Sequence, residues 1–259
     1  MPESLLLPAV AAHLSDPRLV AVAIVGCLAG VVRGFSGFGA ALVYVPLVSA
    51  IYDPPVAAAT IFLISLVFAA PFAIGAFPRC DWRSVLPLVI AASVTVPVGA
   101  AALQLLDPVT MRWVMAAMVT CGLVLLAYGR RYHGRPRLPV TLAVGGVAGV
   151  FGGAAQMSGP PVVVYWLGGP SDAAVVRANL MVFFTLTAAM SGLTYYLQGL
   201  FTPRALAVGV VAGPAYAAGM AVGVRLFRLA SDRTFRRIAI LIVALAALIG
   251  LPAFDRFYR

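Results

Sequence analysis

Residues 30–46 read GVVRGFSGFGAALVYVP, and this stretch decides how the chain folds. It lies within an apolar run, yet it contains four glycines, one serine and a single arginine, Arg33. Each glycine inside a helix costs about 1 kcal/mol, so a cluster of them predicts a break in the helix. Irregular backbone at membrane depth is tolerated only where it is buried in protein or lines a cavity. We therefore expect the freed N–H groups and the arginine to face a polar space that suits an anion.

The composition identifies the class of protein. The 259-residue chain is 63% hydrophobic and only 10% charged, which excludes an ordinary soluble domain. Apolar runs long enough to cross a bilayer recur along it, so we predict an all-α polytopic membrane protein. The net charge of +10 comes from arginine alone, since lysine is absent. The arginines lie mainly between apolar runs, which indicates loops that orient the protein rather than nucleic-acid binding.

Acidic and metal-binding side chains are missing from the apolar runs. Glu3 is the only glutamate, the seven aspartates lie at run ends or in loops, and His13 and His133 also lie outside the runs. Proton relays and metal sites within a membrane usually need Asp, Glu or His in the spans. We therefore expect no cofactor, no metal and no enzyme active site. The N-terminus lacks a basic region, so a cleaved signal peptide is not expected.

The decisive stretch has a second copy. A shift of 119 residues places Gly26, Gly30 and Gly34 on Gly145, Gly149 and Gly153, and Asp53 on Asp172. We interpret this as a duplication into two repeated halves of four spanning helices each, both opening with a glycine-broken first helix or hairpin. The predicted divisions are an N-terminal segment 1–18, a first membrane repeat 19–129, a basic connecting loop 130–137, a second membrane repeat 138–254 and a C-terminal tail 255–259.

The glycine breaks allow two topologies. The first break is expected to divide the apolar run into Leu19–Val32 and Gly39–Ile51, and the next helix to extend from Asp53 to Phe77. If the breaks only kink their helices, the arginines divide 10 to 7 between the two sides; if they are hairpins, the division is 13 to 5. The positive-inside rule favours the sharper division. It makes the halves inverted repeats, with the 130–137 loop in the cytoplasm and both termini outside.

Nine residues are candidates for binding a substrate anion. Arg33 offers a fork of donors to an oxyanion, although a snorkelling arginine is the alternative. Residues at the two breaks would add hydroxyls, an amide and N–H groups before short helices, although glycines that pack helices together are a competing explanation. Thr60 and Asn179 correspond at the same shift of 119, and interhelical hydrogen bonds are their alternative role. Asp53 and Asp172 are interpreted as N-caps. The candidates are Arg33, Ser36, Gly37, Gly39, Thr60, Gln156, Ser158, Gly159 and Asn179.

Two motifs carry a resemblance to a known family. They are GxxxGxxxGFSGFGxxLxxVP at residues 26–46 and AxxxRANLMVFFTLTAAMSGLTYY at residues 173–196. Together with the duplicated plan, they make the chain resemble the TauE/SafE family of sulfite-exporter permeases. The resemblance implies a multi-pass protein of the bacterial inner membrane that moves sulfite, an organosulfonate or a related anion.

Two classes of function stay open at this point. One is an anion permease working by alternating access. The other is a membrane-embedded enzyme or a structural subunit of a larger complex, although the spans lack an acid or histidine to serve as a base. The expected partners are a small anion and membrane lipid, with a homo-oligomer as a further alternative, and not nucleic acid.

Overall fold

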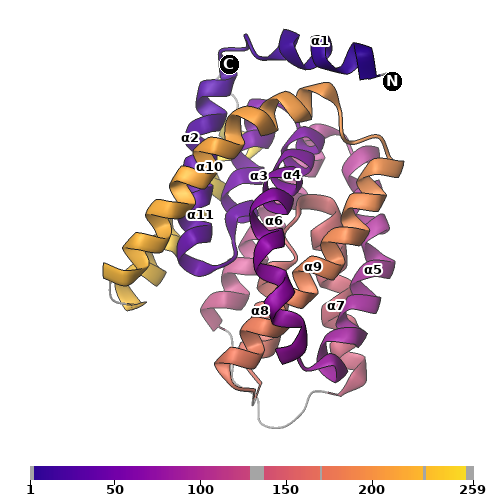
Figure 1. Ribbon diagram of the computed structural model, residues 1–259, viewed down its shortest axis with the longest axis vertical. Helices are drawn as coiled ribbons and strands as arrows, with labels where there is room; N and C mark the ends of the chain where they lie inside the picture. The colour runs from indigo at the N-terminus through magenta and orange to yellow at the C-terminus, as the bar shows by residue number, and fades with distance from the viewer. Residues whose placement is uncertain (1–2, 129–136, 170, 230–231, 255–259) are drawn as a thin grey trace.

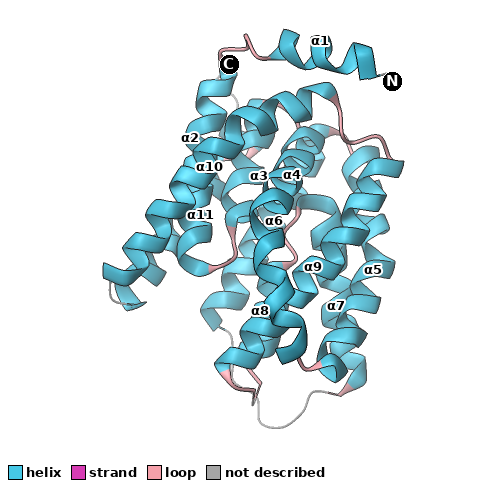
Figure 2. Cartoon of the chain, viewed as in Figure 1, coloured by secondary structure: helices cyan, strands magenta, loops and turns pink. Residues whose placement is uncertain are grey.

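Helices make up every regular element that the structure describes. A computed structural model describes residues 3–128, 137–169, 171–229 and 232–254, and its helices form an elongated bundle (Figures 1 and 2). The α-helices are α1 (Glu3–His13), α2 (Arg18–Ser36), α3 (Ala40–Ile51), α4 (Pro54–Ala73), α5 (Trp82–Leu105), α6 (Pro108–Tyr128), α7 (Leu138–Ala155), α8 (Gly159–Leu167), α9 (Ala173–Leu197), α10 (Pro203–Leu229) and α11 (Asp232–Ile249). The 3-10 helices are η1 (Ile74–Arg79) and η2 (Pro252–Phe254).

The first glycine break is a hairpin. Gly37 and Gly39 have positive φ angles of 75° and 89°, a left-handed backbone that glycine adopts without steric cost. The chain then returns along α3, because the Tyr52 hydroxyl at the end of α3 donates to the Asp16 carboxylate just before α2, at 2.9 Å. The hairpin alternative is thus the one that the structure adopts.

The second break has the same form. Gln156 caps α7 with a φ of 56°, and α8 begins three residues later. Tyr165 near the end of α8 shares a 2.8 Å hydrogen bond with Thr141 in the first turns of α7. The end of α8 therefore returns to the face at which α7 begins.

Both short helices lie inside the bundle. Most of α3 is buried, including Ala40–Pro46, and so is most of α8. The longer helices surround them (Figure 1). This arrangement satisfies the condition that broken backbone at membrane depth must be covered by protein.

The first break is narrower than the sequence predicts. We expected the helix to end near Val32, but α2 continues to Ser36, so Arg33 and Gly34 are helical. Gly30 and Gly34 instead pack against α10, where an added Cβ would overlap the carbonyl oxygens of Tyr216 and Met220. Glycine is needed at these two positions for close contact between α2 and α10, which was the competing explanation for the glycines. Only Gly37 and Gly39 break the backbone.

A second pair of helices packs in the same way. α7 runs along α5, as α2 runs along α10. An added Cβ at Gly145 would lie 2.6 Å from the Leu88 carbonyl oxygen, and one at Gly153 would overlap the carbonyl oxygen of Val96. Positions increase together along each pair, so the paired helices are parallel. Each pair joins an element from the first part of the chain to one from the second.

Contacts between helix ends show which helices begin or end at the same end of the bundle. The start of α2 and the end of α3 lie at one end of the bundle, the end at which α1 is also seen in Figure 1. The Arg112 guanidinium, in the first turn of α6, donates to the Gly250 carbonyl after α11 at 2.9 and 3.1 Å, which joins α11 to that face. Residues 129–136 of the predicted connecting loop, and the predicted tail 255–259, lie outside the described residues.

The predicted spans and helix boundaries are partly confirmed. Within the described residues, six helices are long and apolar enough to cross a membrane, where eight were predicted: α2, α5, α6, α7, α9 and α10. α4 contributes a shorter apolar stretch, Pro54–Phe68. It ends at Ala73 rather than Phe77, because a 3-10 helix follows.

The two predicted N-caps differ. Asp53 caps α4 as expected, with its carboxylate accepting the Val56 N–H at 2.8 Å. Asp172 precedes α9, but its side chain makes no capping hydrogen bond. Its backbone carbonyl accepts the Val176 N–H at 2.9 Å, so Asp172 occupies the predicted N-cap position of α9 without a side-chain capping bond.

Candidate functional site

The tips of the two hairpins meet inside the bundle. An added Cβ at Gly159 would lie 3.4 Å from Cδ2 of Phe38, between the two glycines of the first tip. The helices that follow the tips also approach each other at α6, where an added Cβ at Gly122 would lie 2.9 Å from Pro160 Cγ and 3.9 Å from Leu42 Cδ2. Residues about 120 positions apart in the sequence thus form one junction.

The first tip has a left-handed glycine backbone, and an arginine lies one turn before it. Arg33 lies in the last turn of α2 and is partly buried, and its charge acts on Tyr216 of α10. Its carbonyl oxygen accepts the Gly37 N–H at 2.8 Å. Ser36 is the last residue of α2, and Gly39 precedes α3. The arginine is therefore one turn before the tip rather than at it.

No carboxylate compensates Arg33 within the described part of the chain. No salt bridge within 4.0 Å involves it there, and each described acid lies between helices or is the first residue of one. A partly buried cation without a carboxylate partner is a favourable place for an anion.

The second tip offers an amide, a hydroxyl and few backbone N–H groups. The Gln156 side chain donates to the Gly152 carbonyl at 3.1 Å, which holds it near the end of α7. Ser158 is the N-cap of α8, and Gly159 is its first residue. Pro160 and Pro161 then occupy the first turn, and proline has no N–H. Backbone donors at this helix therefore have to come from Ser158 and Gly159 rather than from the two prolines.

Thr60 and Asn179 occupy comparable environments at opposite faces. Both side chains are fully buried. Thr60 donates to the Ala205 carbonyl at the start of α10, at 3.4 Å, and Asn179 accepts the Asp81 N–H just before α5, at 2.8 Å. The structure does not bring them together, and these contacts match the interhelical role that was their alternative. The Asn179 amide nitrogen is buried without a partner among the described residues.

Three buried tyrosines near the candidates were not identified from the sequence. Tyr195 donates to the Gly153 carbonyl at 2.7 Å, close to Gln156. Tyr216 lies against the Arg33 helix, and the Tyr44 hydroxyl is buried near Thr60 without a well-formed hydrogen bond to a described residue. Aromatic residues are common in apolar spans, so only their burial distinguishes these three.

Comparison with known proteins covers both hairpins and the helices around them. The family model described as "Sulfite exporter TauE/SafE" matches residues 22–249. The chain belongs to the TauE/SafE family. It is also similar to the "Probable sulfite/organosulfonate exporter TauE" of Cupriavidus necator, with 27% identity over 229 residues, 84% of this chain and 88% of that protein. No solved structure matches the chain significantly.

Membership of the TauE/SafE family identifies the general role. The protein is a multi-pass transporter of the bacterial inner membrane, in agreement with its six spanning helices among the described residues. All nine candidate residues lie within the region that matches the TauE/SafE model.

Proposed function

We propose that the protein moves a small anion, sulfite or an organosulfonate, across the inner membrane by alternating access of two inverted halves. The observation that carries this proposal is the reciprocal packing of the two parallel helix pairs, α2 with α10 and α5 with α7. The printed name of the Cupriavidus necator relative supports the choice of anion.

The two helix pairs use contacts at corresponding positions. Gly26, Gly30 and Gly34 face Ala212, Tyr216 and Met220, while Gly145, Gly149 and Gly153 face Leu88, Ala92 and Val96. The residue numbers of equivalent glycines differ by 119, and those of the residues they face differ by 124. The reverse contacts also correspond, because Gly223 faces the Val31 carbonyl and Gly99 faces the Val150 carbonyl. Such agreement is expected if one unit was duplicated.

A duplicated unit with five membrane segments has its two copies in opposite orientations. In the first half these segments are α2 to α6, and in the second half they are α7 to α11. An odd number makes the copies inverted, and inverted repeats with broken helices at their interface are a recurrent transporter design. When each copy adopts the conformation that the other had before, the same site opens to the opposite side of the membrane.

The substrate site in this proposal is the junction of the hairpin tips. Arg33 supplies the positive charge, Ser36, Gly37 and Gly39 supply the first tip, and Gln156, Ser158 and Gly159 supply the second. A guanidinium can bind two oxygens of a sulfonate or sulfite at once. A neutral amide on the opposite tip can orient the anion without adding charge.

Thr60 and Asn179 have a different part in the same proposal. Each is tied to the backbone at the start of a long helix from the other half, Thr60 at one face and Asn179 at the other. Alternating access requires contacts at one face to loosen while those at the other close. We assign these two hydrogen bonds to the two faces that open in turn.

Purified protein in liposomes tests the proposed function. We expect the chain alone to release entrapped sulfite or ethanesulfonate faster than protein-free liposomes, with saturation at high anion concentration. Gluconate, a bulkier anion, serves as the comparison substrate. Absence of flux for every sulfur oxyanion would refute the proposal and favour a structural or enzymatic role.

A further inference from the structure

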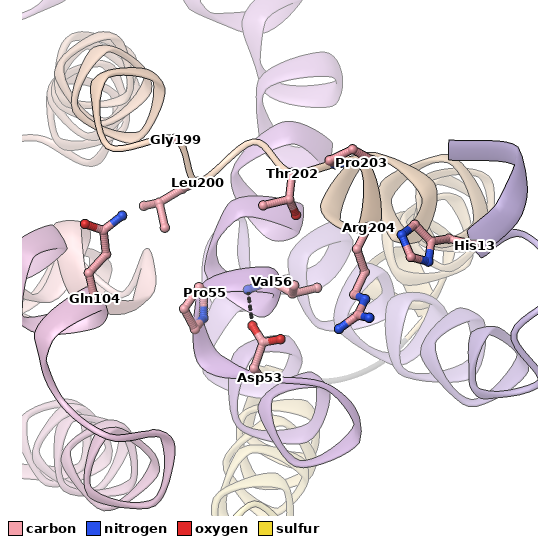
Figure 3. A pocket seen from close by; sticks show the side chains of 10 residues that line it. All are labelled: His13, Asp53, Pro55, Val56, Gln104, Gly199, Leu200, Thr202, Pro203 and Arg204. Carbon is pink, nitrogen blue, oxygen red and sulfur yellow. Dashed lines mark hydrogen bonds between the residues drawn. The ribbon is translucent and has the colours of Figure 1, made fainter. Parts of the chain in front are cut away.

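An open cavity lies apart from the hairpin tips, at the face where α1 ends and where α4 and α10 begin. Its volume is about 660 Å³, within the range of roughly 300–1,000 Å³ typical of small-molecule sites. The end of α1, the starts of α4 and α10, the end of α5 and the α9–α10 connection all contribute to it (Figure 3). We call it the vestibule. Its lining residues are His13, Asp53, Pro55, Val56, Gln104, Gly199, Leu200, Thr202, Pro203 and Arg204.

Three side chains of the vestibule can donate hydrogen bonds to a ligand. Figure 3 shows Arg204 and His13 together on one side, with Gln104 opposite. Arg204 forms no salt bridge with a described carboxylate, and His13 has an N–H donor in either protonation state. Thr202 accepts the Ala205 N–H at 3.2 Å, and its own proton stays available. One N–H of the Gln104 amide is occupied, since it donates to the Gln198 carbonyl at 2.7 Å.

The nearby carboxylates are held by other groups. The Asp16 carboxylate accepts the Arg18 N–H and the Tyr52 hydroxyl, both at 2.9 Å, and the Arg18 N–H holds the pKa of Asp16 below its usual value. Burial, together with the bond to Asp16, raises the pKa of Tyr52 to about 12, so this hydroxyl stays a donor at neutral pH. Asp53 is held by the Val56 N–H. Neither carboxylate therefore neutralises Arg204 by direct contact.

We propose that the vestibule binds a singly charged oxyanion through Arg204, His13 and Thr202, and that Asp53 disfavours a second negative charge. The guanidinium and imidazole donors match the oxygens of a sulfonate or similar group. The Asp53 carboxylate lines the same cavity, where the positive end of α4 can compensate a negative charge only in part. The single positive charge of Arg204 can offset a monoanion but only half the charge of a dianion, and the repulsion from Asp53 is twice as large for the dianion.

The distribution of arginine supports a ligand role for Arg204. In the inverted topology this face is the outer one, where the positive-inside rule makes arginine rare. The other described arginines in the helices of this face have visible roles: Arg112 binds the Gly250 carbonyl, and Arg18 neighbours Asp16. Arg204 is directed instead to a cavity (Figure 3). Its charge is thus best explained by an anion that enters or leaves there.

Isothermal titration of the purified protein with ethanesulfonate and with sulfate, at matched ionic strength, tests the inference. We expect wild type to bind ethanesulfonate more tightly than sulfate. Arg204→Gln should weaken ethanesulfonate binding about tenfold, the usual effect of losing a charge-assisted hydrogen bond, and His13→Gln should weaken it less. Arg83→Gln removes the same charge from an exposed position at the opposite face and should leave binding unchanged.

The Asp53→Asn variant tests the charge selectivity. Asparagine is an equally good N-cap, so α4 should stay intact. Sulfate should then bind roughly threefold to tenfold more tightly, and ethanesulfonate, with half the charge, by roughly the square root of that factor. Unchanged sulfate binding would overturn the role of Asp53. Equal ethanesulfonate binding by wild type, Arg204→Gln and His13→Gln, or no binding by wild type, would overturn the site.

The inference rests on the proposed function for the nature of the anion, but the two can fail separately. Liposome flux with unaltered binding in Arg204→Gln would refute the vestibule site and leave the transport function intact. Binding that depends on Arg204 without any flux would support the site and refute transport.

Discussion

Alanine at Gly149 is expected to force α7 away from α5. An added Cβ there would overlap the carbonyl oxygen of Ala92 and Oγ1 of Thr95. At Gly146, in the same helix, an added Cβ would meet only Cγ2 of Thr95, at 3.8 Å, an ordinary contact. Both substitutions gain the same helix propensity, about 1 kcal/mol. The difference in stability between the two variants therefore isolates the helix–helix contact.

The size of the effect follows from the overlap. The two backbones must separate by roughly 1 Å to restore van der Waals distance, and such a gap forfeits a quarter to a half of the dispersion energy of each affected atom pair. Overpacking of a tight interface typically costs about 1–3 kcal/mol. Gly149→Ala should be less stable than Gly146→Ala by this amount, which corresponds to a melting temperature lower by about 2–12 °C.

Thermal unfolding in detergent, followed by the survival of the monodisperse peak in size-exclusion chromatography, measures this difference. The equivalent contact gives an independent repeat: Gly30→Ala on α2 should be destabilised by a similar amount relative to Gly213→Ala, where a Cβ would reach only Phe68 at 4.0 Å. Melting temperatures of Gly149→Ala and Gly146→Ala that agree within error would refute the claim that glycine is required for packing.

Three further predictions concern topology and transport. Reporter fusions should place the 130–137 loop in the cytoplasm and the C-terminus outside, and a cytoplasmic C-terminus would contradict the inverted arrangement. Arg33→Lys and Arg33→Gln should both lower liposome flux about tenfold or more, because lysine lacks the planar fork; full activity with lysine would indicate an arginine that only snorkels to headgroups. Asn179→Ala removes the acceptor of the Asp81 N–H, with a loss of about 1–3 kcal/mol, and should weaken flux per inserted molecule. Wild-type flux in that variant would remove Asn179 from the mechanism.

The sequence predicts the features that depend on local backbone chemistry. Glycines at positions 37 and 39 break the helix because only glycine adopts a left-handed backbone cheaply, and Asp53 caps α4 through its own neighbours. The count of arginines on the two sides favours hairpins over kinks from the sequence alone. Each of these predictions needs only the sequence of a short segment or a count of the arginines in the loops.

Features that depend on distant partners could not be predicted in the same way. Gly30 and Gly34 looked like helix breakers, because the sequence does not reveal that α10 lies against them. Asp172 is the N-cap residue of α9 as predicted, but the sequence does not reveal that its side chain makes no capping bond. His13 and Arg204 both line the vestibule although most of the chain separates them in sequence. No motif or spacing in the sequence indicates that they share a cavity.

In the proposed duplication, the two halves agree where they pack and differ where an anion would bind. Glycines at equivalent positions serve both helix pairs, so the same close contact recurs in each proposed half. Near the tips, Arg33 has Gly152 as its equivalent, and Gly37 has Gln156. A small anion at the junction of two related halves cannot be symmetric with respect to both, and a second arginine would leave one positive charge uncompensated. A single arginine near one tip and a neutral amide at the other are therefore the arrangement expected for one negative charge, the same charge that Asp53 and Arg204 are proposed to favour in the vestibule.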